Sequence, residues 1–165
     1  MIAGAIFDVD GTLLDSMWIW DTIGVDYLRS IGYEPREDLA AVFKDMSLYQ
    51  AACYYQREYG VALPTDEIIA GVNRMIEGYY QEDVQAKPGV GAFLQSLQGQ
   101  GVPMCICTAT DRPLVECALK RLGLLGYISK IFTCSEVGHG KDQPDIYRQA
   151  LHRLGTTKPR TAVFE

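Results

Sequence analysis

Two aspartates separated by one residue, Asp8 and Asp10, follow a short apolar run near the N-terminus, and Gly11 and Thr12 come directly after them. A carboxylate that attacks phosphorus forms an aspartyl-phosphate, and a second carboxyl group close by can protonate the leaving alkoxide and then activate water. We therefore expect Asp8 to be a nucleophile and Asp10 to be the general acid and base. This pairing predicts phosphoryl transfer.

Side chains suited to binding a phosphoryl group follow other parts of the chain. Thr108 and Ala109 come after an apolar run, and Lys141 stands shortly before an amphipathic segment. A hydroxyl and the free backbone N–H groups that we expect at Gly11 and Ala109 can hold phosphoryl oxygens, and an ammonium neutralises the charge that develops on them. Thr108 and Lys141 therefore join the two aspartates as expected catalytic residues. The expected phosphate-binding set is Gly11, Thr12, Thr108, Ala109 and Lys141.

Oxygen ligands for a metal ion are also present. Mg²⁺ is a hard cation that usually sits between one or two carboxylates and a phosphate. Asp8 and Glu165 can supply carboxylates and Asp10 its backbone carbonyl, so these three residues are the expected magnesium ligands. The same ion would screen the attacking carboxylate from the negatively charged phosphate.

These residues need a fold that brings them together. Apolar runs predict buried strands at Ala3 to Phe7, Val102 to Cys107, Lys130 to Cys134 and Thr161 to Phe164. Amphipathic patterns between the runs predict helices over residues 90–100, 111–122 and 143–154. The alternation predicts an α/β protein with a Rossmann-like parallel sheet, and such sheets bind ligands outside the carboxyl ends of their strands.

The stretch from residue 15 to residue 87 interrupts this alternation with helical periodicity. Its apolar positions predict helices from Met17 to Ser30, from Leu48 to Tyr59 and from Thr65 onward. We therefore expect a catalytic core made of residues 1–14 and 88–165, with residues 15–87 inserted as a helical domain.

Composition argues against several classes of partner. Lys and Arg total 15 against 21 Asp and Glu, and the net charge of −6 opposes attraction to nucleic acid and to anionic membranes. No run approaches the ~18 apolar residues of a membrane span. The five cysteines contain no C-x-x-C pair, which favours reduced thiols in a cytoplasmic protein. The expected partner is a small phosphorylated metabolite, and no obligate protein partner is evident.

Several segments resemble the haloacid dehalogenase superfamily of phosphatases and phosphomutases. The family's first motif, D-x-D-G-T-L-x-D-S, is similar to residues 8–16, and its later motifs are similar to the strand ending at Thr108, to Gly140-Lys141 and to Val163-Phe164-Glu165. The resemblance spans the chain and implies the same site roles. The insert is similar to the helical cap of the β-phosphoglucomutase-like and phosphoglycolate-phosphatase-like branch, whose substrate-selecting loop falls at Lys44 and Ser47.

Two departures from the family pattern bear on activity. The chain stops at Glu165, where the family continues with a second acidic residue and a helix, so we expect a C-terminally truncated core lacking one metal ligand. Trp20 stands where related mutases carry a histidine, which favours hydrolysis.

The expected function is a Mg²⁺-dependent phosphatase acting on a small phosphorylated metabolite such as a sugar phosphate. A β-phosphoglucomutase-like sugar-phosphate mutase and a catalytically impaired truncated fragment are the alternatives. The order of the motifs opposes a phosphoaspartate receiver domain, because here the acids end the first strand and a helical insert follows.

Overall fold

The computed structural model describes residues 2–43, 46 and 48–165. The chain forms two compact units: Met1–Ser16 with Tyr80–Glu165, and Met17–Tyr79. The junctions between the units therefore fall after Ser16 and before Tyr80. The role of the inserted segment as a cap stays a prediction.

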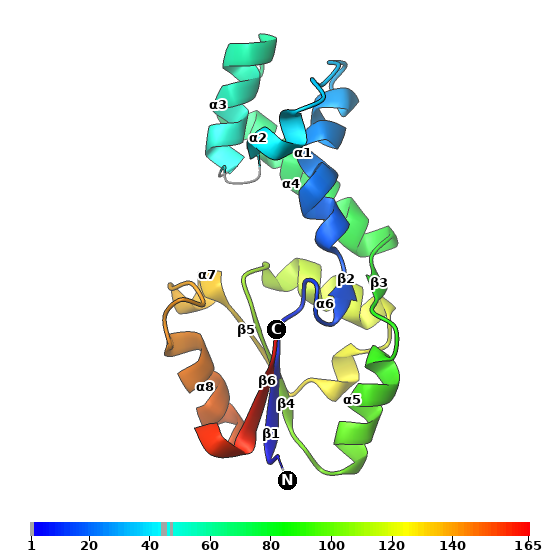
Figure 1. Ribbon diagram of the computed structural model, residues 1–165, viewed down its shortest axis with the longest axis vertical. Coiled ribbons are helices and arrows are strands. Elements are labelled where there is room, and N and C mark those ends of the chain that lie inside the picture. The colour runs from blue at the N-terminus through cyan, green and yellow to red at the C-terminus, as the bar shows by residue number, and fades with distance from the viewer. Residues whose placement is uncertain (1, 44–45, 47) are drawn as a thin grey trace. The chain divides into compact units, whose positions relative to one another are not determined.

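The larger unit is built around a four-stranded parallel sheet (Figure 1). Its strands are β1 (Gly4–Phe7), β4 (Met104–Thr108), β5 (Lys130–Thr133) and β6 (Thr161–Phe164). They lie in the order β5-β4-β1-β6, so the first strand in sequence is central. Strands β1 and β4 are buried along their whole length, which explains why they are continuous apolar runs. The predicted α/β architecture is confirmed.

Helices cover both faces of this sheet. Helix α8 (Asp145–Leu154) lies on one side, and α5 (Val90–Gly99) and α6 (Arg112–Arg121) lie on the other (Figure 1). Short 3₁₀ turns, η1 (Leu125–Tyr127) and η2 (Lys158–Arg160), complete the connections. The apolar stripe of α8 packs against the central strands through Ile146, Ala150, Leu154, Ile6, Cys105 and Cys107.

Two expectations about the strands are wrong. Strand β5 was expected to run to Cys134 but stops at Thr133. Helix α7 (Cys134–Val137) begins there, and the Thr133 hydroxyl caps it by accepting from the Glu136 N–H at 3.3 Å. Strand β6, which was expected to be buried, is only half-buried, because among the described strands it lies at the edge of the sheet beside β1.

A second, two-stranded sheet was not predicted. Strand β2 (Leu14–Asp15) pairs antiparallel with β3 (Gln85–Ala86), which places the chain entering the insert beside the chain leaving it. Each strand has two residues, and two residues are too few to show an alternating pattern.

The smaller unit is helical. It contains α1 (Met17–Ser30), α2 (Leu39–Phe43), α3 (Leu48–Tyr59) and most of α4 (Thr65–Glu82), whose last turn belongs to the larger unit. The buried Tyr55 donates its hydroxyl to the Gly24 carbonyl at 2.5 Å. The Phe43 ring lies where a Cβ on Gly24 would be, so this position needs glycine. The short helix α2 was not predicted.

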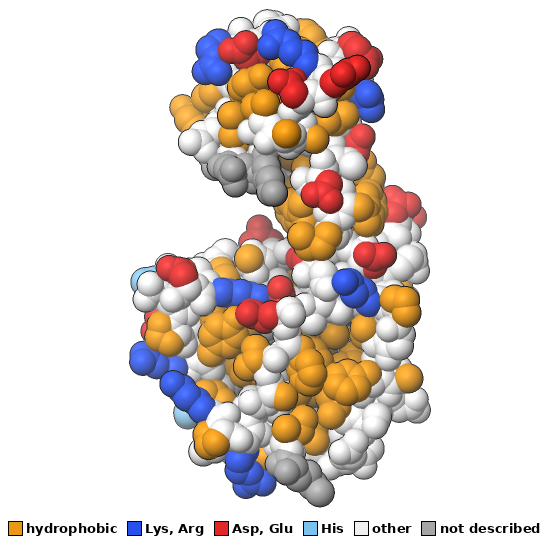
Figure 2. Space-filling model, in the orientation of Figure 1, with side chains coloured by type: hydrophobic (Ala, Val, Ile, Leu, Met, Phe, Trp, Pro, Cys, Tyr) orange, Lys and Arg blue, Asp and Glu red, His pale blue; other side chains and the backbone are white. Residues whose placement is uncertain are grey.

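Some apolar side chains of the larger unit face solvent. Phe93 and Val163 are exposed, and Figure 2 shows hydrophobic side chains gathered on the face that carries β6. Among the described residues, no helix is both long and apolar enough to cross a membrane.

Candidate active site

The expected site residues lie at the carboxyl ends of the parallel strands. Asp8 directly follows β1, Thr108 is the last residue of β4, and Glu165 directly follows β6. Because parallel strands end at the same edge of the sheet, this topology gathers residues from distant parts of the chain. Two separate clusters of side chains result.

The first cluster is ionic. The Lys141 ammonium lies 2.7 Å from Asp8 Oδ1 and 3.1 Å from Glu165 Oε1. The Tyr147 hydroxyl donates to the same oxygen of Glu165. Asp8 and Lys141 are about one-fifth exposed, and Glu165 is half-exposed. The structure thus brings three of the predicted residues together around one cation.

The charges of this cluster influence each other's protonation. Burial lowers the pKa of Lys141, but its hydrogen bonds to Asp8 and Glu165 outweigh that effect, so the pKa lies above the ordinary value. The hydrogen bond from Tyr147 lowers the pKa of Glu165, and Lys141 adds to this shift. Both shifts favour the charged forms of Lys141 and Glu165.

The second cluster surrounds Asp10 with hydroxyl groups. Ser16 Oγ donates to Asp10 Oδ1 at 2.5 Å, the Tyr80 hydroxyl donates to the same oxygen, and Thr110 Oγ1 donates to Oδ2. Ser16 and Tyr80 are fully buried. Burial and the adjacent Asp10 charge raise the pKa of Tyr80, so this phenol remains a proton-bearing donor.

Two of these donors sit at the junctions of the inserted unit. Ser16 is the last residue before Met17–Tyr79, and Tyr80 is the first residue after it. Both junction residues belong to the larger unit and meet at one oxygen of Asp10. The residues at both ends of the insert therefore bind the proposed acid and base group by hydrogen bonds.

Sequence reasoning missed four residues of this site: Ser16, Tyr80, Thr110 and Tyr147. Three of them lie close in sequence to predicted residues. Ser16 ends the first motif, Thr110 lies two residues beyond Thr108, and Tyr147 lies in the first turn of the helix after Lys141. Tyr80 is 70 positions from Asp10 and gives no local signal.

Other expected phosphate ligands are arranged differently. The Gly11 N–H was expected to be free, but it donates to the Leu14 carbonyl at 2.9 Å, because the loop closes on itself as a tight turn. Likewise the Thr12 N–H donates to the Val9 carbonyl at 3.2 Å. The expectation of a free N–H at Gly11 is therefore wrong, and phosphate contacts of Gly11 and Thr12 stay predictions.

Thr108 contacts the hydroxyl cluster around Asp10 through its neighbour Thr110. The Thr108 hydroxyl accepts from the Thr110 N–H at 3.1 Å, and the Thr108 side chain is buried. Ala109 is exposed. Lys44 and Ser47, the predicted specificity residues, lie outside the described residues.

The side chains fit a magnesium ion through their oxygen chemistry. Among the described residues, no three His, Cys, Asp or Glu side chains form a metal-binding group. Asp8 and Glu165 nevertheless face one cation, the Lys141 ammonium. The Asp10 carboxylate accepts hydrogen bonds from hydroxyls, so its backbone carbonyl remains the expected metal ligand from this residue. Mg²⁺ commonly takes one or two carboxylates and completes its shell with water and substrate phosphate.

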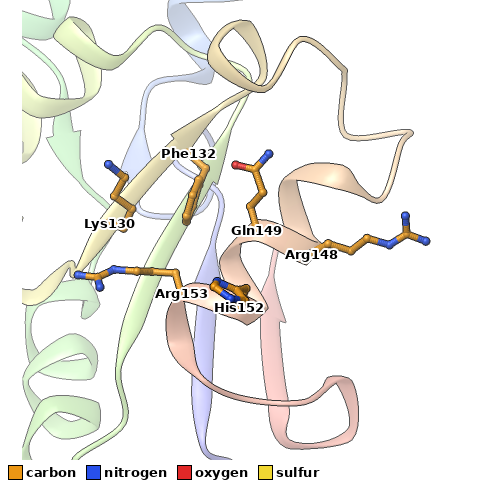
Figure 3. A pocket seen from close by; sticks show the side chains of 6 residues that line it. All are labelled: Lys130, Phe132, Arg148, Gln149, His152 and Arg153. Carbon is orange, nitrogen blue, oxygen red and sulfur yellow. The ribbon is translucent and has the colours of Figure 1, made fainter.

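A pocket of about 650 Å³ lies elsewhere on the larger unit, beside the amino end of β5 and the last turn of α8. Figure 3 shows Lys130 and Arg153 extending to one side of Phe132 and Arg148 to the other. Its cations spread apart, and none of the expected site residues lines it. It does not form part of the candidate site.

The family model of haloacid dehalogenase-like hydrolases matches residues 2–165. The chain belongs to this family. The resemblance drawn from the motifs is confirmed, and so is the expectation of a hydrolase.

Relatives of this hydrolase include named phosphatases. Hexitol phosphatase A of Escherichia coli K12 is 29% identical, over 98% of this chain and 73% of that protein. The 6-phosphogluconate phosphatase of the same strain is 26% identical, over 93% of this chain and 69% of the relative. A candidate beta-phosphoglucomutase from Thermotoga maritima has a matching fold, with a TM-score of 0.88 at 22% identity, over 98% of this chain and 75% of that one.

Proposed function

We propose that this hydrolase is a Mg²⁺-dependent phosphatase that cleaves a small phosphorylated metabolite, such as a sugar phosphate, through an aspartyl-phosphate on Asp8. The observation that carries the proposal is the contrast between two neighbouring carboxylates: Asp8 faces the Lys141 ammonium, whereas Asp10 faces three hydroxyls. The named activities of the relatives support the substrate class.

In the first step, a carboxylate oxygen of Asp8 attacks phosphorus, and the bond from phosphorus to the leaving alkoxide breaks. The Asp10 carboxyl group gives its proton to that alkoxide, so the product leaves as an alcohol. The Lys141 ammonium, 2.7 Å from Asp8, neutralises charge on the phosphoryl oxygens as they approach.

In the second step, water attacks the phosphorus of the aspartyl-phosphate. The Asp10 carboxylate takes a proton from that water, the bond from Asp8 to phosphorus breaks, and inorganic phosphate forms. The hydroxyls of Ser16, Tyr80 and Thr110 hold the Asp10 carboxylate between these steps. A bound Mg²⁺ would supply electrostatic stabilisation of the phosphoryl group, held by Asp8, the Asp10 carbonyl and Glu165.

The test is phosphate release from hexitol phosphates, 6-phosphogluconate and an aryl phosphate, with Mg²⁺ and again with a chelator. Acid quenching during turnover followed by mass spectrometry should find one added phosphoryl group on the peptide containing Asp8. Release that needs Mg²⁺ and a phosphorylated Asp8 peptide are the expected results. Absence of phosphate release from every substrate would overturn the proposal.

The same assay separates hydrolysis from intramolecular transfer. A mutase would convert one sugar phosphate into its isomer, need a bisphosphate to start, and release little free phosphate. Trp20, in place of a mutase-type histidine, supports hydrolysis. Isomer formation in excess of phosphate would contradict that conclusion.

A further inference from the structure

The last turn of α4 lacks the charge that normally stabilises the end of a helix. A helix leaves its last four carbonyls without partners inside the helix, and a cation near them is favourable. Helix α4 has no basic residue in its last turn, and it ends at Glu82 followed by Asp83. Tyr80, which holds Asp10, lies in this turn.

Arg121 supplies the missing cation from another helix. It is the last residue of α6, and its Nη2 donates to the Tyr80 carbonyl at 3.4 Å and also to the Val84 carbonyl. A charged donor makes a stronger hydrogen bond than a neutral one. The guanidinium thus joins the last turn of α4 to the segment that leads into β3.

Helix α6 is connected to the Asp10 cluster at both of its ends. Thr110 lies just before the helix and donates to Asp10 Oδ2, while Arg121 closes the helix and binds the backbone of Tyr80. Tyr80 in turn donates to Asp10 Oδ1. One helix therefore supports both carboxylate oxygens, the first through Thr110 and the second through Arg121 and Tyr80.

We propose that Arg121 is a positioning residue that holds the turn of Tyr80, and through Tyr80 the orientation of the Asp10 carboxyl group, for leaving-group protonation. This inference rests on the proposed function, because Asp10 must be the general acid. Arg121 itself has no contact with Asp10 among the described interactions, so it acts through Tyr80.

The inference predicts a dependence on the leaving group. An alkoxide from a sugar phosphate is a poor leaving group and needs the proton of Asp10, whereas a nitrophenolate leaves readily without it. Loss of Arg121 should therefore lower kcat/KM for a sugar phosphate and spare nitrophenyl phosphate. Loss of folded enzyme would lower both values equally, so the ratio reports positioning alone.

The experiment compares Arg121→Gln, Arg121→Lys, Tyr80→Phe and the Arg121→Gln/Tyr80→Phe double variant in the full chain with Mg²⁺. We expect Arg121→Gln to lower kcat/KM for hexitol phosphate about tenfold and for nitrophenyl phosphate less than about twofold. Arg121→Lys should restore part of the loss. In the Tyr80→Phe background, Arg121→Gln should add less than about twofold, because coupled residues are not additive. Lys120→Gln, on the exposed neighbour in α6, is the matched control.

Amide hydrogen exchange supplies a measurement that does not need activity. Arg121→Gln should speed exchange in the peptide covering residues 80–87, and Lys120→Gln should not. Unchanged exchange there, equal losses for both substrates, or fully additive losses in the double variant would each overturn the role of Arg121. If the unaltered chain hydrolyses neither substrate, the proposed function fails, and the exchange result alone decides whether Arg121 holds this turn.

Discussion

The ionic cluster around Lys141 and the hydroxyl cluster around Asp10 begin from carboxylates only two residues apart. In the first, a cation lies 2.7 Å from Asp8. In the second, three neutral donors surround Asp10, two of them fully buried. Both arrangements stabilise a carboxylate, but they leave different chemistry open to it.

The difference supports the two separate roles proposed for these carboxylates. An ammonium that binds a carboxylate also attracts the phosphate that the carboxylate must attack. Hydroxyl donors fix the direction of a carboxylate without adding charge, which suits a group that must take up and release a proton. Different surroundings can give two carboxylates different roles, which is what we propose for Asp8 and Asp10.

Asp8→Asn tests the ionic side and should have the largest effect. It removes the proposed nucleophile, so phosphate release from hexitol phosphate and from nitrophenyl phosphate should both fall by roughly 10⁴-fold. Asp66→Asn, on an exposed residue in the first turn of α4, is the control. Retention of activity within about tenfold would assign the attack to another group.

Asp10→Asn tests the hydroxyl side and should separate the two substrates. Loss of general acid catalysis should lower kcat/KM for hexitol phosphate by about 10²–10⁴-fold, with a much smaller loss for nitrophenyl phosphate. Steady-state kinetics on both substrates measure this ratio. Equal losses for both substrates would show that Asp8 and Asp10 do not have the separate roles that their surroundings suggest.

Thr110→Val removes one donor of the hydroxyl cluster with little change in shape. Asp10 Oδ2 then loses its hydrogen bond from Thr110 in a part-buried site, so the free energy of unfolding should fall by about 1–3 kcal/mol. Urea denaturation measures the change, and Thr157→Val at an exposed position is the matched control. An unchanged midpoint would mean that water replaces the hydroxyl.

Glu136→Gln extends the comparison to a carboxylate held by a guanidinium. Arg112 donates to both oxygens of Glu136 at 2.6 Å and lowers the pKa of that carboxyl below its ordinary value of 4.5. Because the folded pKa is depressed, the ion pair stabilises the fold above about pH 4.5, and this contribution is lost as pH falls through the folded pKa.

We therefore expect Glu136→Gln to lower the free energy of unfolding by about 0.5–1 kcal/mol at about pH 7, since the pair is partly exposed and screened. The difference from the unaltered chain should shrink toward about pH 3. Urea denaturation at both pH values measures it, with Glu37→Gln on an exposed residue as the control. A difference that grows as pH falls would contradict the assigned pairing.

The regular elements could be predicted because their buried apolar residues recur in the sequence with the period of a helix or a strand. The helices Met17–Ser30 and Leu48–Tyr59 and the strand Thr161–Phe164 have the bounds that their apolar patterns predict. The pair of two-residue strands and the five-residue helix Leu39–Phe43 are too short to repeat the pattern that would reveal them.

The site was predictable where it follows strand ends. Asp8 and Glu165 come together because parallel strands share an edge, a rule that needs only the order of the elements. Lys141 reaches them from the loop that precedes α8. The contact from Tyr80 to Asp10 depends on where the last turn of α4 lies in the larger unit. In a sequence, a buried tyrosine on an amphipathic helix looks like an ordinary core residue. The hydrogen-bond partner of the Gly11 N–H was not predicted either. The local turn sets this partner, and the residue types alone do not reveal it.

Because β2 pairs with β3, the inserted segment resembles a long loop whose two ends lie side by side and are joined by backbone hydrogen bonds. Leu14 lies opposite Ala86 and Asp15 opposite Gln85, so the chain that enters the insert and the chain that leaves it are paired within the larger unit. Chains tolerate insertions best where the ends lie close together, because the host domain then keeps its own geometry. We therefore expect the parallel sheet to keep its register when the length or sequence of Met17–Tyr79 changes.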